Sequence, residues 1–89
     1  MEEAEKRRYV GIDLGKREYT MAFIGLNGKM SIHKGKTTEQ GRAVMYRLLE
    51  KNYKIALEAG NMAFKMAREI MQRVGSEVRV LHSAKLPLI

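Results

Sequence analysis

The chain has 89 residues and a net charge of +7, which allows one small domain and favours polyanionic partners such as DNA. It contains no cysteine, which excludes disulfides and thiolate metal sites and leads us to expect a cytoplasmic protein. The apolar runs are too short to span a membrane, and the charged first residues exclude a signal peptide. We expect residues 1–7 to be a disordered charged start and residues 8–89 to form one domain.

The first part of the chain predicts an antiparallel meander of three strands. Alternating apolar side chains predict strands over residues 8–14 and 19–26. Asn27 and Gly28 then indicate a tight hairpin, because both residue types tolerate positive φ. The returning strand, residues 29–34, is polar enough to lie near a sheet edge.

A helix should follow the meander. Thr37 and Gln40 have the spacing of a capping box, with Thr37 as the N-cap, and the helix should end near Asn52. Apolar residues three and four apart predict its buried stripe. These residues are Gly41, Val44, Met45, Leu48 and Leu49.

The rest of the chain predicts a strand, a helix and a strand. Residues 54–57 form a short apolar run that suits a sheet interior, and residues 77–81 predict the last strand. Between them, Asn61 is a plausible N-cap and Gly75 a fitting C-cap glycine. The inner stripe of this helix is Ala63, Ala67, Ile70, Met71 and Val74.

This order predicts an α/β fold with a mixed five-stranded sheet. Helical crossovers lead to the last two strands, which favours parallel pairing and right-handed connections. If the fourth strand lies beside the first, Asp13 and Glu58 come together at the carboxyl edge of the sheet.

Asp13 and Glu58 are the candidate catalytic and metal-binding residues. Each ends an apolar strand, and burying an unpaired carboxylate is costly, so the pair suggests acids gathered around Mg²⁺ or Mn²⁺. Such a pair is typical of metal-dependent phosphoryl transfer. Lys16 and Arg17 could reach phosphate or nucleic acid, although a solvated turn explains them better. Asp13 could instead accept hydrogen bonds from backbone amides near Gly15 or pair with these cations. Glu58 could instead be an acid that is stabilised by the dipole of the helix that follows it.

Four short segments resemble one enzyme family. Residues 9–16 (YVGIDLGK), 37–41 (TTEQG), 56–59 (ALEA) and 78–85 (VRVLHSAK) are similar to the N-terminal RuvC-like domain of DEDD transposases. These are the insertion-sequence one-ten enzymes, relatives of the Piv invertase.

The resemblance implies an RNase H-like fold and a function in DNA recombination. Asp13 and Glu58 match the first two of the family's four acids, and the other two would lie after the end of this chain. The whole protein would be a transposase that cuts and joins DNA with two Mg²⁺ ions, guided in some members by RNA. The chain would be a C-terminally truncated, inactive fragment. A missing helix would leave one sheet face uncovered, so we also expect self-association.

Three alternatives fit the same residues. One is a Holliday-junction resolvase-like nuclease with the same metal site. Another is a nucleotide-binding fragment of the actin, sugar-kinase and heat-shock ATPase type, in which residues 11–15 (GIDLG) would open a phosphate hairpin. Those proteins usually continue with Thr, Ser or Asn, whereas Lys16 follows here. The third is a basic nucleic-acid-binding module without catalysis.

Overall fold

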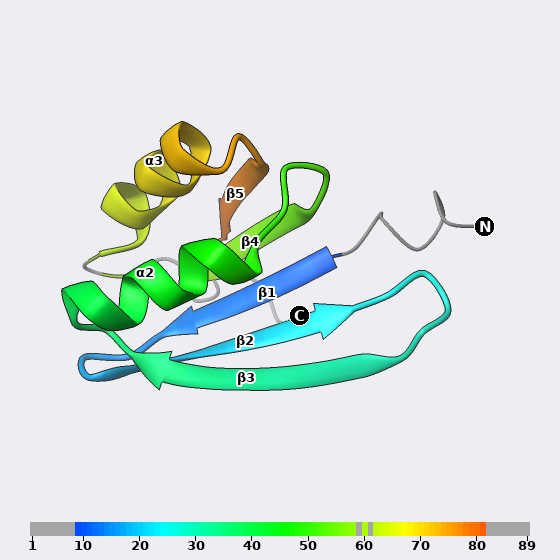
Figure 1. The fold of residues 1–89 in the computed structure, drawn as a ribbon, viewed down its shortest axis with the longest axis horizontal. Coiled ribbons are helices and arrows are strands. Elements are labelled where there is room, and N and C mark those ends of the chain that lie inside the picture. Colours follow the sequence, from blue (N-terminus) through cyan, green and yellow to red (C-terminus); the bar gives the residue numbers. More distant parts are fainter. Residues whose placement is uncertain (1–8, 59, 61, 82–89) are drawn as a thin grey trace, which may run out of the picture.

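The computed structural model describes residues 9–58, 60 and 62–81, which form a five-stranded sheet with two helices (Figure 1). The predicted α/β class is therefore confirmed. In chain order the elements are β1 (Tyr9–Leu14), β2 (Glu18–Ile24), β3 (Met30–Lys36), α2 (Glu39–Leu48), β4 (Lys54–Glu58), α3 (Ala63–Arg73) and β5 (Glu77–Leu81).

The strands follow the order β3-β2-β1-β4-β5, so β1 is central. The pairs β1–β2 and β2–β3 are antiparallel, whereas β1–β4 and β4–β5 are parallel. The predicted meander is confirmed, and the fourth strand lies beside the first, which was the condition for Asp13 and Glu58 to come together. The third strand lies at a sheet edge, as its polar sequence indicates.

Both helices pack against the same face of the sheet. The alternation of side chains along each strand directs one set toward the helices, and this set forms a single apolar core with them. Its fully buried members are Val10, Tyr19, Met21 and Leu57 from the strands and Met45, Met66 and Ile70 from the helices. This apolar burial is the main source of stability, at about 1.5–3 kcal/mol for each large side chain.

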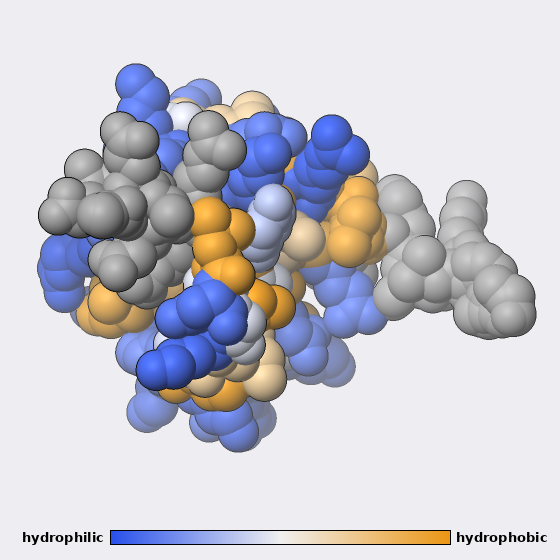
Figure 2. All heavy atoms as spheres, turned by 90° about the vertical axis from the view of Figure 1, so that its right-hand side faces the viewer, coloured by the Kyte–Doolittle hydropathy of each residue, from blue (hydrophilic) through white to orange (hydrophobic). Residues whose placement is uncertain are grey.

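The opposite side, which we call the open face, includes Tyr9, Gly11 and Asp13 of β1 and the residues in register with them on the other strands. No helix of the described residues covers it (Figure 1). Large apolar side chains are exposed there, among them Met30 at 62% and Ile32 at 53%. Figure 2 shows exposed apolar side chains beside hydrophilic ones, from the right-hand side of Figure 1. Self-association through the open face stays a prediction.

The hairpin between β2 and β3 is longer than the sequence predicts. The last pair of the ladder is Ile24 with Met30, so five residues (25–29) connect the strands. Only Gly28 has positive φ, at 86°, and its N–H donates to the Gly25 carbonyl at 2.9 Å. Asn27 acts through its side-chain oxygen, which accepts from the N–H of Lys29 at 3.0 Å.

Helix α2 begins one residue later than predicted and ends earlier. Its N-cap is Thr38, whose hydroxyl accepts from the N–H of Gly41 at 3.1 Å. The prediction of Thr37 is wrong because the Thr37 hydroxyl donates elsewhere, to the carbonyl of Lys16 at 2.9 Å. The helix ends at Leu48, which is 39% exposed, and Tyr46 is buried instead.

Helix α3 follows its prediction more closely. Gly75 has φ of 85° and donates its N–H to the Ile70 carbonyl at 3.1 Å, which confirms the C-cap glycine. The buried stripe includes Met66, whereas Met71 is 49% exposed. The predicted N-cap Asn61 lies outside the described residues, and no described helix is long and apolar enough to cross a membrane.

Gly41 is required where α2 begins beside the end of β3. A Cβ at this position would collide with the backbone carbonyl of Lys36, and the Gly41 carbonyl accepts from the Tyr19 hydroxyl at 2.8 Å. We predict that Gly41→Ala lowers the free energy of unfolding by about 2 kcal/mol, as overpacking does elsewhere. Urea denaturation measures this change. Gly60→Ala is the control, because its Cβ would meet nothing within 4 Å, and an equal loss in both variants would contradict the prediction.

Candidate functional site

Asp13 and Glu58 lie side by side at one end of the open face. The parallel register pairs Ile12 with Leu57, so the next residue on each strand is one of the two acids. Both side chains are exposed, and both border a shallow hollow of about 320 Å³. The structure therefore brings the two sequence-predicted acids to one place, while their role as metal ligands stays a prediction.

Small residues line the hollow beside the two acids. Gly11, Ala22 and Ala56 occupy neighbouring positions on β1, β2 and β4, and all three line it. A Cβ added to Gly11 would meet nothing within 4 Å, so the space above the central strand is open. A ligand could therefore approach the backbone of the sheet here, next to the two carboxylates.

The arrangement supplies two acidic ligands and no more. Among the residues that the structure describes, no group of three or more His, Cys, Asp and Glu side chains could hold a metal ion. A divalent cation bound between Asp13 and Glu58 would therefore need oxygens from water or from a ligand to complete its coordination. Magnesium is commonly bound in this way, by one or two carboxylates together with phosphate oxygens.

The turn between β1 and β2 lies next to this hollow. Gly15 donates its N–H to the Glu18 carbonyl at 2.8 Å, and a Cβ on Gly15 would approach that oxygen to 2.9 Å. Glycine is therefore needed for the tight return of the chain. Lys16 and Arg17 form the tip of the turn and are exposed, so both predicted cations remain accessible to an anion.

Thr37 fixes the back of this turn, a contact that the sequence did not reveal. Its hydroxyl donates to the carbonyl of Lys16 and its N–H to the carbonyl of Arg17, both at 2.9 Å. Lys36 joins Lys16, Arg17 and Thr37 around a second hollow of about 420 Å³. The sequence did not predict Lys36 and Thr37 as site residues. The sequence feature that could have indicated them is the run of a lysine and two threonines at positions 36–38.

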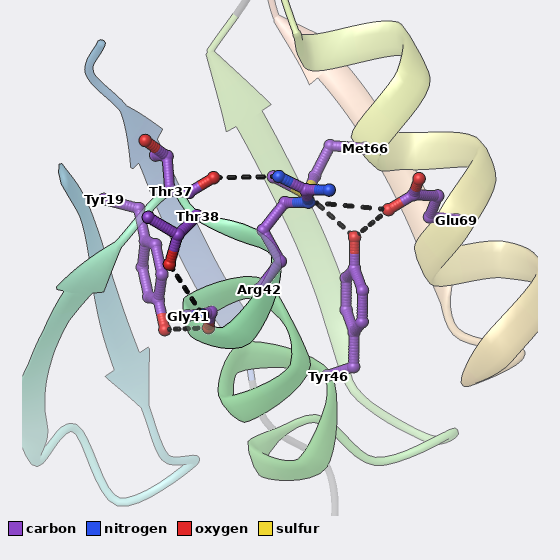
Figure 3. A network of polar contacts seen from close by, with 8 residues as sticks. All are labelled: Tyr19, Thr37, Thr38, Gly41, Arg42, Tyr46, Met66 and Glu69. Carbon is purple, nitrogen blue, oxygen red and sulfur yellow. Dashed lines mark hydrogen bonds and ion pairs between the residues drawn. The ribbon is translucent and has the colours of Figure 1, made fainter. Parts of the chain in front are cut away.

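Tyr46 and Glu69 form a polar contact between the helices. The Tyr46 hydroxyl donates to a Glu69 carboxylate oxygen, and the ring lies beneath the Arg73 guanidinium, 5.2 Å from it (Figure 3 shows the hydroxyl contact). Burial, and secondly the hydrogen bond and negative charge of Glu69, raise the pKa of Tyr46 to about 12.

Comparison with known proteins gives structural matches alone. No family model and no curated protein matches this chain. The solved structures that it resembles include three from Aquifex aeolicus. They are a type II variant of the Ppx/GppA phosphatase (15% identity, TM-score 0.43), the PPX-GPPA enzyme (15%, 0.49) and a Ppx/GppA family member (18%, 0.44). They cover 84%, 89% and 84% of this chain, which spans only 35%, 37% and 35% of theirs.

The resemblance to DEDD transposases is wrong. The structural matches are Ppx/GppA proteins and not transposases, which contradicts the expected functions in transposition and DNA recombination. The four segments were misleading because three of them are only a strand, or its last residues, and the residues that follow it, and such a pattern is not specific to one family. A strand that ends in an acid and a glycine turn, as in residues 11–15, fits more than one protein family.

The raised pKa of Tyr46 predicts a loss of stability at high pH. In the unfolded chain this tyrosine ionises near its ordinary value of 10.0, below its folded pKa of about 12, so the unfolded state releases the proton first. The contribution of the neutral Tyr46 hydroxyl to the free energy of unfolding is complete below pH 10 and declines as the pH rises toward 12. Tyr46→Phe should remove a late-ionising component from the tyrosinate absorbance titration and flatten the fall in stability. Tyr9→Phe is the control because Tyr9 is exposed, and identical titrations for both variants would contradict the assignment.

Proposed function

We propose that this chain is a phosphate- and nucleotide-binding fragment of the actin, sugar-kinase and heat-shock ATPase type. The observation that supports it is the juxtaposition of Asp13 and Glu58, through the β1–β4 register, beside the turn of Lys16 and Arg17. Acidic and basic side chains thus lie at the same end of the sheet, with Asp13 and Glu58 at one hollow and Lys16 and Arg17 at a second. This combination suits a ligand that has both phosphate groups and a bound divalent cation, such as a magnesium–nucleotide complex.

Asp13 and Glu58 would hold Mg²⁺ or Mn²⁺. Both side chains are exposed and border the same hollow, so a cation can reach them from solvent. When bound, the cation neutralises phosphate oxygens and allows them to approach two negatively charged side chains. The small residues of the hollow leave room for the ligand above the strands.

Lys16 and Arg17 would bind the phosphates at the tip of the turn. Other proteins of this type usually have Thr, Ser or Asn after the glycine, so Lys16 would replace a hydroxyl or amide contact with an ammonium. An ammonium has three donors and a full charge, which favours phosphate over a neutral ligand. Thr37 donates hydrogen bonds to the backbone carbonyls of the turn, which leaves the two cationic side chains exposed.

The cation site is tested by manganese titration with NMR line broadening. We expect broadening centred on Asp13 and Glu58, strengthened by ATP and lost in Asp13→Asn, which keeps the shape of the side chain but removes its charge. Glu77→Gln is the matched control, because Glu77 lies on β5 at the other end of the sheet and pairs with Arg79 at 3.6 Å. Broadening that survives Asp13→Asn, or that is lost equally in both variants, would contradict a cation site at this place.

The phosphate site is tested by ATP affinity in the presence of Mg²⁺. We expect saturable binding that weakens about tenfold, or about 1.4 kcal/mol, when Lys16 and Arg17 are both changed to Gln. A double change of Lys29 and Lys51 to Gln removes the same charge from exposed positions outside the turn. Equal losses in the two double variants would indicate non-specific attraction of polyanions, as expected for a basic nucleic-acid-binding module.

A further inference from the structure

The phosphate-facing turn is bonded to one residue of the segment between β3 and α2. Thr37 donates to two consecutive carbonyls of the turn, those of Lys16 and Arg17. Thr37 directly follows β3, and its N–H bond to Arg17 continues the β2–β3 ladder past the pair of Glu18 and Lys36. The hydroxyl bond to Lys16 is the additional contact that reaches the tip of the turn. A contact that holds Thr37 in this position therefore supports the turn.

Arg42 makes the contact that fixes Thr37 from the other side. It lies in the first turn of α2, and its Nη1 donates to the carbonyl of Thr37 at 2.8 Å. The Arg42 side chain is mostly buried, with 17% of it exposed. A charge-assisted hydrogen bond in such a place is stronger than one between neutral groups.

Helix α3 orients the guanidinium. Nε of Arg42 lies 3.9 Å from Oε1 of Glu69, and the same carboxylate oxygen accepts from the Tyr46 hydroxyl. Figure 3 shows Arg42 between Thr37 on one side and Glu69 on the other, with Tyr46 below. Arginine suits this position because its guanidinium donates to the Thr37 carbonyl while its charge faces Glu69, whereas glutamine lacks the charge and lysine lacks the planar fork.

We infer that Arg42 is a positioning residue, which couples helix α3 to the β1–β2 turn through Thr37. It sets the geometry in which Lys16 and Arg17 meet a phosphate without touching the ligand. The apolar contacts of Met45, Met66 and Ile70 already pack the two helices against the sheet. Arg42 adds a directional hydrogen bond from helix α2 to the carbonyl of Thr37, the residue that is bonded to the turn. The effect on ligand affinity rests on the proposed function, whereas the effect on the turn does not.

The inference is tested first in the ligand-free protein. Thr37 donates its N–H to the carbonyl of Arg17, so amide hydrogen exchange at Thr37 reports directly on the attachment of the turn. We expect Arg42→Gln to speed this exchange about tenfold and Arg42→Lys to restore it in part. Arg47→Gln is the matched control, because Arg47 lies on the same helix, is exposed and bears the same charge.

A second control separates positioning from general stability. Tyr46→Phe removes the hydroxyl contact with Glu69 but keeps the contact between Arg42 and Thr37. It should lower the free energy of unfolding with a smaller effect on Thr37 exchange than Arg42→Gln has. If Arg42→Gln and Tyr46→Phe speed exchange equally across all sheet amides, Arg42 is merely structural and the inference is overturned.

The ligand measurement distinguishes this inference from the proposed function. We expect Arg42→Gln to weaken ATP binding about fivefold while Arg47→Gln leaves it unchanged. Thr37 exchange that is identical in these two variants overturns the inference, whether or not ATP binds. Faster exchange in Arg42→Gln, with no ATP binding by the unchanged protein, contradicts the proposed function but supports the attachment of the turn by Arg42. Faster exchange at Thr37 in Arg42→Gln, together with unchanged ATP affinity, would overturn the inference that Arg42 positions the ligand site.

Discussion

The parallel pairing of β1 with β4 is the interaction on which the rest of the structure depends. It joins the antiparallel meander to the part of the chain that alternates helix and strand, and it makes β1 the centre of the sheet. The register also decides where the acids lie. A slip of one residue in β4 would turn Glu58 toward the helices and expose Ile55 and Leu57, which are buried. The apolar core therefore fixes the register, and the register fixes the candidate site.

The one-sided placement of the helices has a second consequence. Because α2 and α3 both pack on one face, stability comes from that face, and residues of the open face have less influence on it. Gly11, Ala22 and Ala56 would leave a cavity if they lay under the helices, whereas on the open face they form a hollow that a ligand can enter. The division between a packed face and a candidate binding face thus follows from the alternation of side chains along the strands.

The β1–β2 turn is joined to the helices by polar contacts rather than by apolar packing. An ion pair joins Glu69 to Arg42, and hydrogen bonds to backbone carbonyls then join Arg42 to Thr37 and Thr37 to the turn. Such contacts specify geometry more closely than apolar contacts, which tolerate small displacements. A segment that binds phosphate needs this kind of support, because a displacement of about 1 Å can weaken a charged hydrogen bond.

Much of the local structure was predictable because it depends on neighbouring residues. Alternation predicted the strands, and Gly75 at the end of α3 was predicted from the need for a residue with positive φ. The parallel direction of the last two strands followed from the crossover rule, whereas the pairing of the fourth strand with the first was a condition and not a prediction. One error arose where two residues compete for one role. Thr37 and Thr38 are equally good N-caps in sequence, and only the position of the turn beside Thr37 assigns the cap to Thr38.

The sequence by itself determined the fold class, the antiparallel meander and the residue types at the ends of the strands. These follow from periodicity and from the chemistry of side chains next to one another in the chain. The tertiary structure alone decided that Asp13 and Glu58 share a hollow, that Thr37 bonds the turn and that Arg42 contacts both Thr37 and Glu69. Each of these contacts joins residues far apart in sequence. Their distance depends on strand register and helix packing, and no local pattern encodes it.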